Sequence, residues 1–350
     1  MKQERLDNVQ LLRGIAAVAV IFEHAFDQFV NHPIAGMPVL ASPIGSVWGN
    51  GVDLFFVISG FIMYFLTHDH FAENGYPAEF LKRRCIRVVP TYWLFTTMMI
   101  LATVARPDAV NNSIGSVWHA VSSYIFIPSA RPDGLMHPVL GLGWTLNYEF
   151  FFYACYAIAL VAPAAWGISL LVAAFLALAC LHAVMPPGIL AFWSDPIILE
   201  FIAGLFIAMA FVHGVRITRA SWAVLLAIAG VVLALVLPLR VSEAYRLLGS
   251  GLPSVMIAAA LILTPNRRWW RPAILIGDAS YAMYLTHPFA LNAVTAVWSK
   301  LHLPLERHAY WPALVLGSLV AGVAVYWLVE RPIIALLRRR FEPRRHSLAA

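Results

Sequence analysis

Long apolar runs recur from one end of this 350-residue chain to the other. A helix that crosses a membrane needs about 20 consecutive apolar residues, so runs of this length restrict the fold more than any other feature. Such runs cover residues 9–30, 48–67, 88–105, 143–163, 166–186, 194–213, 219–239, 245–264, 275–298 and 309–331. With only 12% charged residues, the chain has too little charge to cover a soluble protein of this size. We therefore expect an all-α fold, a polytopic transmembrane helix bundle of about ten spans.

Basic residues are distributed unevenly between the segments that connect these runs. If the N-terminus is cytoplasmic, most arginines and lysines fall on the cytoplasmic side, and the opposite loops hold Arg106, Arg131, Arg240, Arg246, Lys300 and Arg307. The positive-inside rule then predicts that both termini are cytoplasmic. The apolar stretch 117–127 is too short to cross, so we expect it in a long outer loop, 106–142. The chain is expected to form one membrane domain, 1–340, followed by a short basic tail, 341–350.

The sequence gives little sign of a metal site or of nucleotide-fold chemistry. Cys85, Cys155 and Cys180 lie in or beside separate runs, with the spacing of neither a metal site nor a disulfide framework. The motifs GxxxxGK[ST], GxGxxG and HExxH are absent. The formal charge of +6 follows the predicted topology, so it does not indicate nucleic-acid binding.

Ionisable side chains on four different predicted helices reach one depth, in the outer half of the membrane. These side chains are His24, Asp53, Glu149 and Glu200. His24 lies eleven residues after Arg13, about 16 Å further along the helix on nearly the same face. His287 lies just beneath them, near mid-membrane. Ionisable groups in hydrocarbon are costly unless they pair or face a cavity, so we predict one shared cavity. For Glu200, a simple hydrogen bond between helices remains an equal alternative.

A second candidate site lies at the cytoplasmic end of the third run, in FLKRRCIRVVPTYWL (80–94). Arg84 and Arg87, three residues apart, share one face of a helix. Their planar guanidinium groups suit bidentate binding of phosphate oxygens. Basic residues at this position also anchor lipid headgroups and set topology, so both interpretations stay open. Pro90 is expected to start or kink the span that follows.

Taken together, these stretches resemble the acyltransferase family 3 membrane proteins. The matching features, in order over nearly the whole chain, are Arg13 and His24 separated by ten positions, GVDLFFVISGF (51–61), the Arg84 and Arg87 pair, WTLNYEFFFY (144–153), LEFIAGL (199–205), SYAMYLTHP (280–288) and VERP (329–332). Two of these stretches look most like the succinoglycan-type exopolysaccharide O-acetyltransferases. The family often has two consecutive acids where Glu149 is here followed by Phe150. The given chain also has no C-terminal hydrolase-type domain, so a two-domain relay is not expected.

The resemblance implies an enzyme of the bacterial cytoplasmic membrane that moves an acyl group, expected to be acetyl, onto a glycan hydroxyl. The donor would be cytoplasmic acyl-CoA, which is a substrate rather than a resident cofactor. Arg13, Arg84 and Arg87 would contact it. The acceptor would be a surface or exopolysaccharide glycan, lipid-linked or free; a small glycosylated metabolite such as a macrolide is an alternative. A flippase for lipid-linked sugars would use the buried acids as a proton relay but leaves the arginine pair without a role. A structural subunit of an export complex explains none of the buried charge.

Acyl transfer to a hydroxyl needs a base for the proton and donors for the oxyanion. We expect His24 to be the base, because neutral imidazole accepts a proton near neutral pH. Asp53 or Glu149 would hold the other ring nitrogen, and the sequence leaves both open. Candidate oxyanion donors are Asn147, Tyr148, Tyr281 and His287. Direct transfer and an acyl-histidine intermediate both stay open. Ser59 and Ser280 are interpreted as small residues at helix contacts rather than as nucleophiles.

Overall fold

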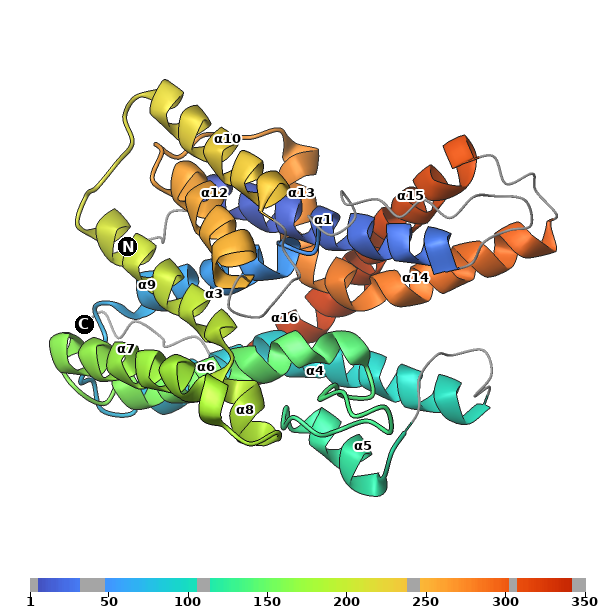
Figure 1. The fold of residues 1–350 in the computed structure, drawn as a ribbon, viewed down its shortest axis with the longest axis horizontal. Coiled ribbons are helices and arrows are strands. Elements are labelled where there is room, and N and C mark those ends of the chain that lie inside the picture. Colours follow the sequence, from blue (N-terminus) through green and yellow to red (C-terminus); the bar gives the residue numbers. More distant parts are fainter. Residues whose placement is uncertain (1–5, 32–47, 106–113, 238–245, 302–306, 342–350) are drawn as a thin grey trace, which may run out of the picture.

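The computed structural model describes residues 6–31, 48–105, 114–237, 246–301 and 307–341, and the regular elements within these ranges are all helices (Figure 1). The α-helices are α1 (Asp7–Asn31), α3 (Gly51–Thr67), α4 (Tyr76–Ala105), α5 (Val117–Tyr124), α6 (Trp144–Ala159), α7 (Ala164–Leu181), α8 (Ile189–Ser194), α9 (Leu199–Val212), α10 (Ala220–Val236), α12 (Leu252–Ile262), α13 (Arg271–Asp278), α14 (Ser280–Lys300), α15 (Arg307–Val325) and α16 (Arg331–Phe341). Three short 3₁₀ turns are η2 (Gly141–Gly143), η3 (His182–Val184) and η4 (Pro196–Ile198). Two segments are π-helical: η5 (Leu247–Gly251) and η6 (Tyr326–Glu330).

The all-α class is confirmed, and each of the ten predicted runs contains a helix. Four segments are long and apolar enough to cross a membrane by length and composition: Asp7–Val30, Tyr76–Ala105, Ala164–Val184 and Ala309–Phe341. Several other apolar helices are shorter than a full span. The count of ten crossings and the cytoplasmic position of both ends therefore stay predictions. The basic tail, 341–350, lies almost entirely outside the described residues.

Two helices do not coincide with the predicted apolar runs. The helix that carries the arginine pair, α4, begins at Tyr76, well before the run 88–105, and Pro90 lies inside it. Its first turns are polar but helical, because Glu79 forms ion pairs with Lys82 and Arg83 one turn further on. The predicted run 275–298 is divided at Ala279, where α13 ends and α14 begins.

The closest contact between helices joins α3 and α9. Each helix places a glycine against the backbone of the other: a Cβ added at Gly60 would overlap the carbonyl oxygen of Phe201, and one at Gly204 would overlap that of Val57. Small residues at such contacts allow two backbones to pack closely, as is common in membrane bundles. This contact fixes the position of α3, from which several of the candidate site residues project.

The remaining helices surround this pair. Figure 1 shows α14 and α15 side by side, and α4, α6 and α7 as neighbours along one side of the molecule. The N-terminal helix α1 packs against α3, α13, α14 and α15, so it lies between the two groups. The short helix α5 packs on α4, where the indole of Trp93 donates to the carbonyl oxygen of Tyr124, 2.8 Å away. The stretch 117–127 thus contains a helix too short to cross, as predicted.

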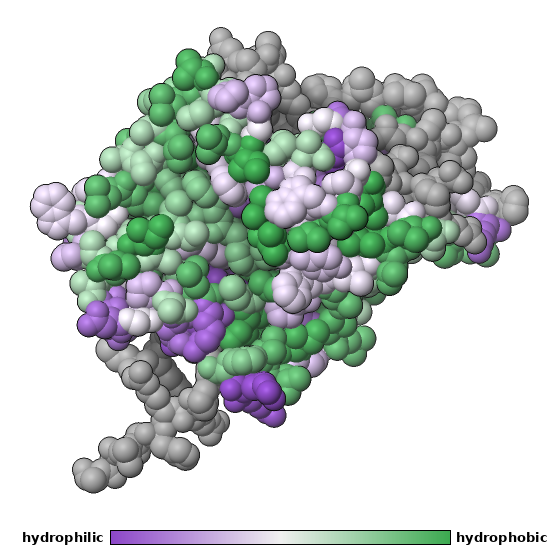
Figure 2. All heavy atoms as spheres, turned by 90° about the horizontal axis from the view of Figure 1, so that it is seen from below, coloured by the Kyte–Doolittle hydropathy of each residue, from purple (hydrophilic) through white to green (hydrophobic). Residues whose placement is uncertain are grey.

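Apolar side chains cover much of the outer surface. Figure 2 shows one face on which hydrophobic residues predominate and hydrophilic ones gather toward the margins. Large apolar side chains such as Val104, Ile158 and Leu328 are more than two-thirds exposed, at 71%, 72% and 76%. An apolar surface this extensive is unusual for a monomeric soluble protein and fits contact with lipid chains.

We predict that Gly204→Ala destabilises the protein, because the new methyl group meets the Val57 backbone, which cannot rotate away. Overpacking of this kind costs about 1–3 kcal/mol. Thermal unfolding in detergent should show a lower Tm. The control is Gly141→Ala, where an added Cβ meets nothing within contact distance. Equal Tm values for the two variants would contradict the proposed packing.

Candidate active site

A pocket opens between α1, α3, α4, α6 and α14. Its polar lining consists of Arg13, Ser59, Arg84, Arg87, Thr145, Glu149, Tyr153, Ser280, Tyr281 and Tyr284. Its apolar lining comes mainly from one side of α3, and consists there of Val52, Phe55, Phe56, Ile58, Ile62 and Met63, with Ser59 among them. This stripe runs from Val52 to Met63, eleven residues or about 16 Å along the helix axis. The pocket is therefore elongated, and charged groups from several helices meet in it.

Three arginines from two helices line this pocket together. Arg13 comes from α1, and Arg84 and Arg87 come from α4. The prediction that Arg84 and Arg87 share one helix face is confirmed, and Arg13 joins them although it is about 70 residues away in the sequence. Arg84 stacks near the ring of Phe80, and its Nε atom is buried without a hydrogen-bond partner. The pocket thus offers a concentrated set of guanidinium donors, which is what binding of an anionic ligand requires.

Arg87 is already engaged. Its guanidinium donates to Oε1 of Glu330 at 2.8 Å, and Glu330 is fully buried, with its second carboxylate oxygen unpartnered. Sequence reasoning missed Glu330 as a site residue, although it lies in the quoted VERP stretch. The available signal was an acid at the end of an apolar run, the same signal that singled out the other buried acids. The pair fixes the direction in which Arg87 points.

Glu149 is held by two hydroxyl groups. Ser59 Oγ donates to Glu149 Oε1 at 3.1 Å, and the Tyr153 hydroxyl donates to the same oxygen. The sequence suggested that Ser59 is only a small residue at a helix contact. Its hydrogen bond to Glu149 shows that it has a further role. The contact with α9 is made by its neighbour Gly60, while the serine side chain lines the pocket.

Asp53 lies elsewhere, in a second polar cluster. Arg246 donates to Asp53 at 3.0 Å, and Glu200 on α9 lies beside Asp53, with neither of its carboxylate oxygens hydrogen-bonded. Asp53 and Glu200 do meet, as their similar depth predicted. Asp53 and Ser59 are six residues apart, however, so their side chains leave α3 about 120° apart. Asp53 and Glu149 were predicted at one depth, but Asp53 points away from the pocket that Glu149 lines. The sequence analysis did not predict Arg246 as the partner of Asp53.

His24 forms a third group with His287. The two rings contact each other edge to face, with centroids 4.8 Å apart. His24 Nδ1 lies 2.9 Å from the carbonyl oxygen of Val20. A carbonyl only accepts, so Nδ1 of neutral His24 carries the proton and Nε2 is the basic nitrogen. The expected carboxylate is replaced by this backbone carbonyl: in the described part of the chain, neither Asp53 nor Glu149 bonds the ring.

The histidine pair and the pocket are neighbours rather than one site. Of the four side chains predicted to share a cavity, Glu149 lines this pocket, whereas His24, Asp53 and Glu200 do not. Tyr284 lines the pocket, and its ring centroid lies 6.1 Å from that of His287. Tyr284 therefore lies between the pocket and the histidine pair. The Nε2 atom of His287, whose ring contacts that of His24, is buried without a hydrogen-bond partner.

The remaining predicted oxyanion donors differ in availability. Tyr281 lines the pocket, but its hydroxyl donates to the carbonyl oxygen of Val88 at 2.8 Å. Asn147 is fully buried, and neither atom of its amide has a hydrogen-bond partner. It lies outside the pocket lining. Tyr148 packs its ring on Phe192. None of these side chains is both in the pocket and free to donate.

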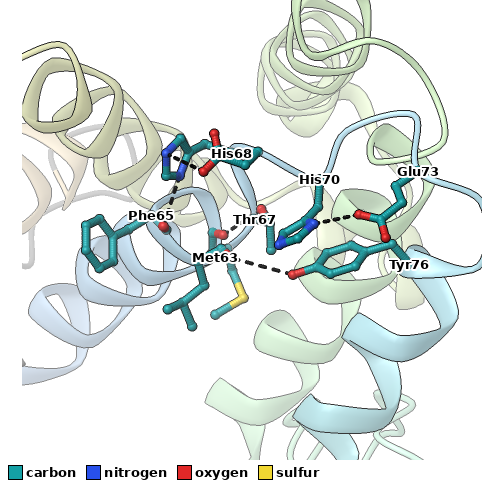
Figure 3. A network of polar contacts seen from close by, with 9 residues as sticks. Met63, Phe65, Thr67, His68, His70, Glu73 and Tyr76 are labelled. Atoms are coloured by element: carbon teal, nitrogen blue, oxygen red, sulfur yellow. Dashed lines mark hydrogen bonds and ion pairs between the residues drawn. The ribbon is translucent and has the colours of Figure 1, made fainter. Parts of the chain in front are cut away.

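A polar network lies where α3 ends and α4 begins (Figure 3). In the loop between α3 and α4, His70 Nδ1 lies 2.6 Å from a carboxylate oxygen of Glu73, and its ring stacks on Tyr76. Thr67 at the end of α3 bonds the hydroxyl of Tyr156 on α6, with the two oxygens 2.7 Å apart. The Tyr76 hydroxyl at the start of α4 donates to the carbonyl oxygen of Leu66 in α3 at 3.4 Å, so α3 is hydrogen-bonded to both α4 and α6.

The ion pair of Arg87 and Glu330 yields a test. Glu330→Ala should leave Arg87 without its buried partner and lower stability by about 3 kcal/mol, because breaking a buried pair exposes one charge to a low dielectric. Glu79→Ala removes the surface partner of Lys82 and Arg83 and should cost at most about 1 kcal/mol. Unfolding by denaturant compares the two. Equal losses in the free energy of unfolding would show that the buried ion pair stabilises the protein no more than the surface pairs of Glu79.

Comparisons with known proteins identify the family of this chain. A family model described as an acyltransferase domain, that of acyltransferase family 3, matches residues 6–327. The chain is 35% identical over 298 residues to the exopolysaccharide production protein ExoZ of Rhizobium meliloti (strain 1021), which covers 83% of this chain and 90% of that protein. No solved structure matches significantly. The chain therefore belongs to acyltransferase family 3 and is a membrane O-acyltransferase.

Proposed function

We propose that this enzyme transfers an acyl group, most simply acetyl, from cytoplasmic acyl-CoA to a hydroxyl of an exopolysaccharide or surface glycan. The observation that carries the proposal is the elongated pocket in which Arg13, Arg84 and Arg87 lie together with Glu149 and Ser59. The printed name of the relative, an exopolysaccharide production protein, supports a glycan as the acceptor. The enzyme would lie in the bacterial cytoplasmic membrane with both ends inside, as one domain.

The arginines are proposed to hold the donor. Coenzyme A carries phosphates at one end and the thioester at the end of a long flexible arm. The guanidinium groups would bind the phosphates, and the apolar stripe on α3 would enclose the arm. The pocket length of about 16 Å along α3 supports this, since the thioester must be delivered deep between the helices. No resident cofactor is invoked.

His24 is proposed to accept the proton of the acceptor hydroxyl. Its Nδ1 donates to the Val20 carbonyl, so Nε2 keeps the lone pair that would accept the proton. His287 would contact His24 from the side and keep the ring in place. Glu149 would contribute its carboxylate from the pocket, where it is hydrogen-bonded to Ser59. Asp53 and Arg246 would line the outer end of the path by which a glycan, lipid-linked or free, approaches.

The function is tested with purified protein in nanodiscs. Acetyl-CoA is supplied with alkali-deacetylated exopolysaccharide, or with the lipid-linked oligosaccharide fraction, of the organism that carries this chain. Release of free CoA together with acetyl on the glycan is the expected result. Translocation of the lipid-linked sugar without consumption of acetyl-CoA would instead identify a flippase. Acylation of a small glycosylated metabolite in preference to the polysaccharide would correct the acceptor class.

Replacing the proposed base should abolish most of the activity. We predict that His24→Ala reduces acetyl transfer by at least about a hundredfold, the effect of removing a general base. The matched control is His213→Ala, because His213 also directs Nδ1 to the carbonyl four residues earlier but lies outside the site. Both rates are measured at equal protein abundance. Near-normal transfer by the His24 variant would end its assignment as the base.

Phosphate binding can be separated from lipid anchoring by conservative substitution. The double variant Arg84→Lys, Arg87→Lys keeps the charge but loses the planar bidentate donors. We predict that it inserts normally and raises KM for acetyl-CoA at least about tenfold, with little change in KM for the glycan. Arg83→Lys is the control, since Arg83 pairs with Glu79 outside the pocket. Unchanged donor affinity in the double variant would make these arginines lipid anchors.

A further inference from the structure

We propose that Ser59 is a covalent nucleophile that carries the acyl group between donor and acceptor. This inference rests on the proposed function and deepens it, because it names the atom to which the acyl group is attached between the two substrates. It follows from three features of the described residues: the position of Ser59 along α3, its place in the pocket lining, and its hydrogen bond to a fixed carboxylate.

Ser59 lies halfway through its helix. It is eight residues from Gly51 at one end of α3 and eight from Thr67 at the other, about 12 Å in each direction. Its side chain lines the elongated pocket and is 7% exposed. A donor on one side of a membrane and an acceptor on the other must exchange the acyl group at an intermediate depth. Ser59 is a nucleophilic hydroxyl at that depth.

The hydroxyl is paired with a base. Ser59 Oγ donates to Oε1 of Glu149 at 3.1 Å, which directs the serine proton at a carboxylate. Tyr153 donates to the same oxygen and fixes its orientation. A serine hydroxyl is a weak nucleophile until an adjacent base takes its proton, and the combination of nucleophile, base and orienting group is the usual means of activation.

The second serine in the pocket lacks this arrangement. Ser280 also lines the pocket, but its Oγ is buried without a hydrogen-bond partner. No carboxylate in the described part of the chain accepts its proton. Two serines in one pocket thus differ in the feature that matters for nucleophilic attack, and that difference selects Ser59.

In the first half-reaction, Ser59 Oγ attacks the thioester carbonyl carbon of acyl-CoA. A bond forms between Oγ and that carbon, and the carbon–sulfur bond breaks. The serine proton passes to Glu149 and from there to the departing sulfur, so free CoA leaves as the thiol and Glu149 is again a carboxylate.

In the second half-reaction, the acceptor hydroxyl oxygen attacks the carbonyl carbon of the serine ester. The bond from carbon to Oγ breaks, and the hydroxyl proton, accepted first by His24, returns to Ser59. Each half-reaction conserves protons at the site. The net result is that the acyl group moves from donor to acceptor while one proton moves the opposite way.

The first experiment looks for the intermediate. Wild-type protein in nanodiscs is incubated with acetyl-CoA labelled in the acetyl group, without acceptor, and its peptides are analysed by mass spectrometry. The expected result is one acetyl ester on Ser59, which is transferred to deacetylated exopolysaccharide when this is added. Label on Ser280 or His24 would overturn the proposal, and so would unlabelled protein in a preparation that transfers acetyl to the glycan. If that preparation neither consumes acetyl-CoA nor acetylates the glycan, the proposed function itself has failed.

Three variants separate chemistry from folding. Ser59→Ala should lose both the label and at least about a hundredfold in transfer rate. Ser59→Cys should still be acylated, but as a thioester that neutral hydroxylamine cleaves, so the chemical lability of the adduct follows the residue. Ser318→Ala is the control, because Ser318 is also buried and its hydroxyl donates to the carbonyl oxygen of Leu314 in its own helix. Normal transfer by Ser59→Ala would overturn the proposal.

Discussion

A charged side chain buried in an apolar bundle must find its partner on another helix, and this requirement organises the protein. Asp53 is bonded by Arg246, 193 positions away, and Arg87 by Glu330, 243 positions away. Glu149 accepts a hydrogen bond from the hydroxyl of Ser59, 90 positions away. An isolated ionisable group in this environment costs at least about 2.5 kcal/mol at the membrane centre. The contacts that satisfy these groups are therefore also the contacts that assemble the site.

Both π-helical segments lie beside these ion pairs. Arg246 comes immediately before η5, and Glu330 is the last residue of η6. A π turn holds one more residue than an α turn, so it changes the direction in which the following side chains project, and such turns are frequent at functional sites. Here each segment coincides with the residue that reaches across to a charged side chain on α3 or α4. In both cases a π-helical segment therefore lies next to, or contains, the residue that forms a long-range ion pair.

The two faces of α3 have different tasks. One stripe, which includes Val57 and Gly60, packs on α9 through backbone contacts that leave no room for a side chain. The other stripe, which includes Phe55, Ser59 and Ile62, lines the pocket. Because the first stripe is held rigidly, the second presents its side chains at fixed positions. A reaction that needs a hydroxyl held against a carboxylate depends on this rigidity.

Much of the fold could be predicted because the membrane imposes it. The length of the apolar runs indicated where helices lie, and the spacing of Arg84 and Arg87 predicted their common face. The helix α4 begins twelve residues before the apolar run 88–105, and its first turns are stabilised by surface ion pairs of Glu79 rather than by apolar burial. Hydropathy carries no signal for a helix stabilised in that way.

For the site, the sequence by itself determined which residues are chemically exceptional: a charged group within an apolar run is visible without any structure. It also predicted which of them lie at similar positions along their helices, because helix rise is constant. Only the tertiary structure decided direction and partnership. Asp53 faces Glu200 and Arg246, Glu149 faces Ser59, and His24 faces His287. The physical reason is that the rotation of each helix about its axis is set by packing against neighbours distant in the chain, and no local pattern encodes that rotation.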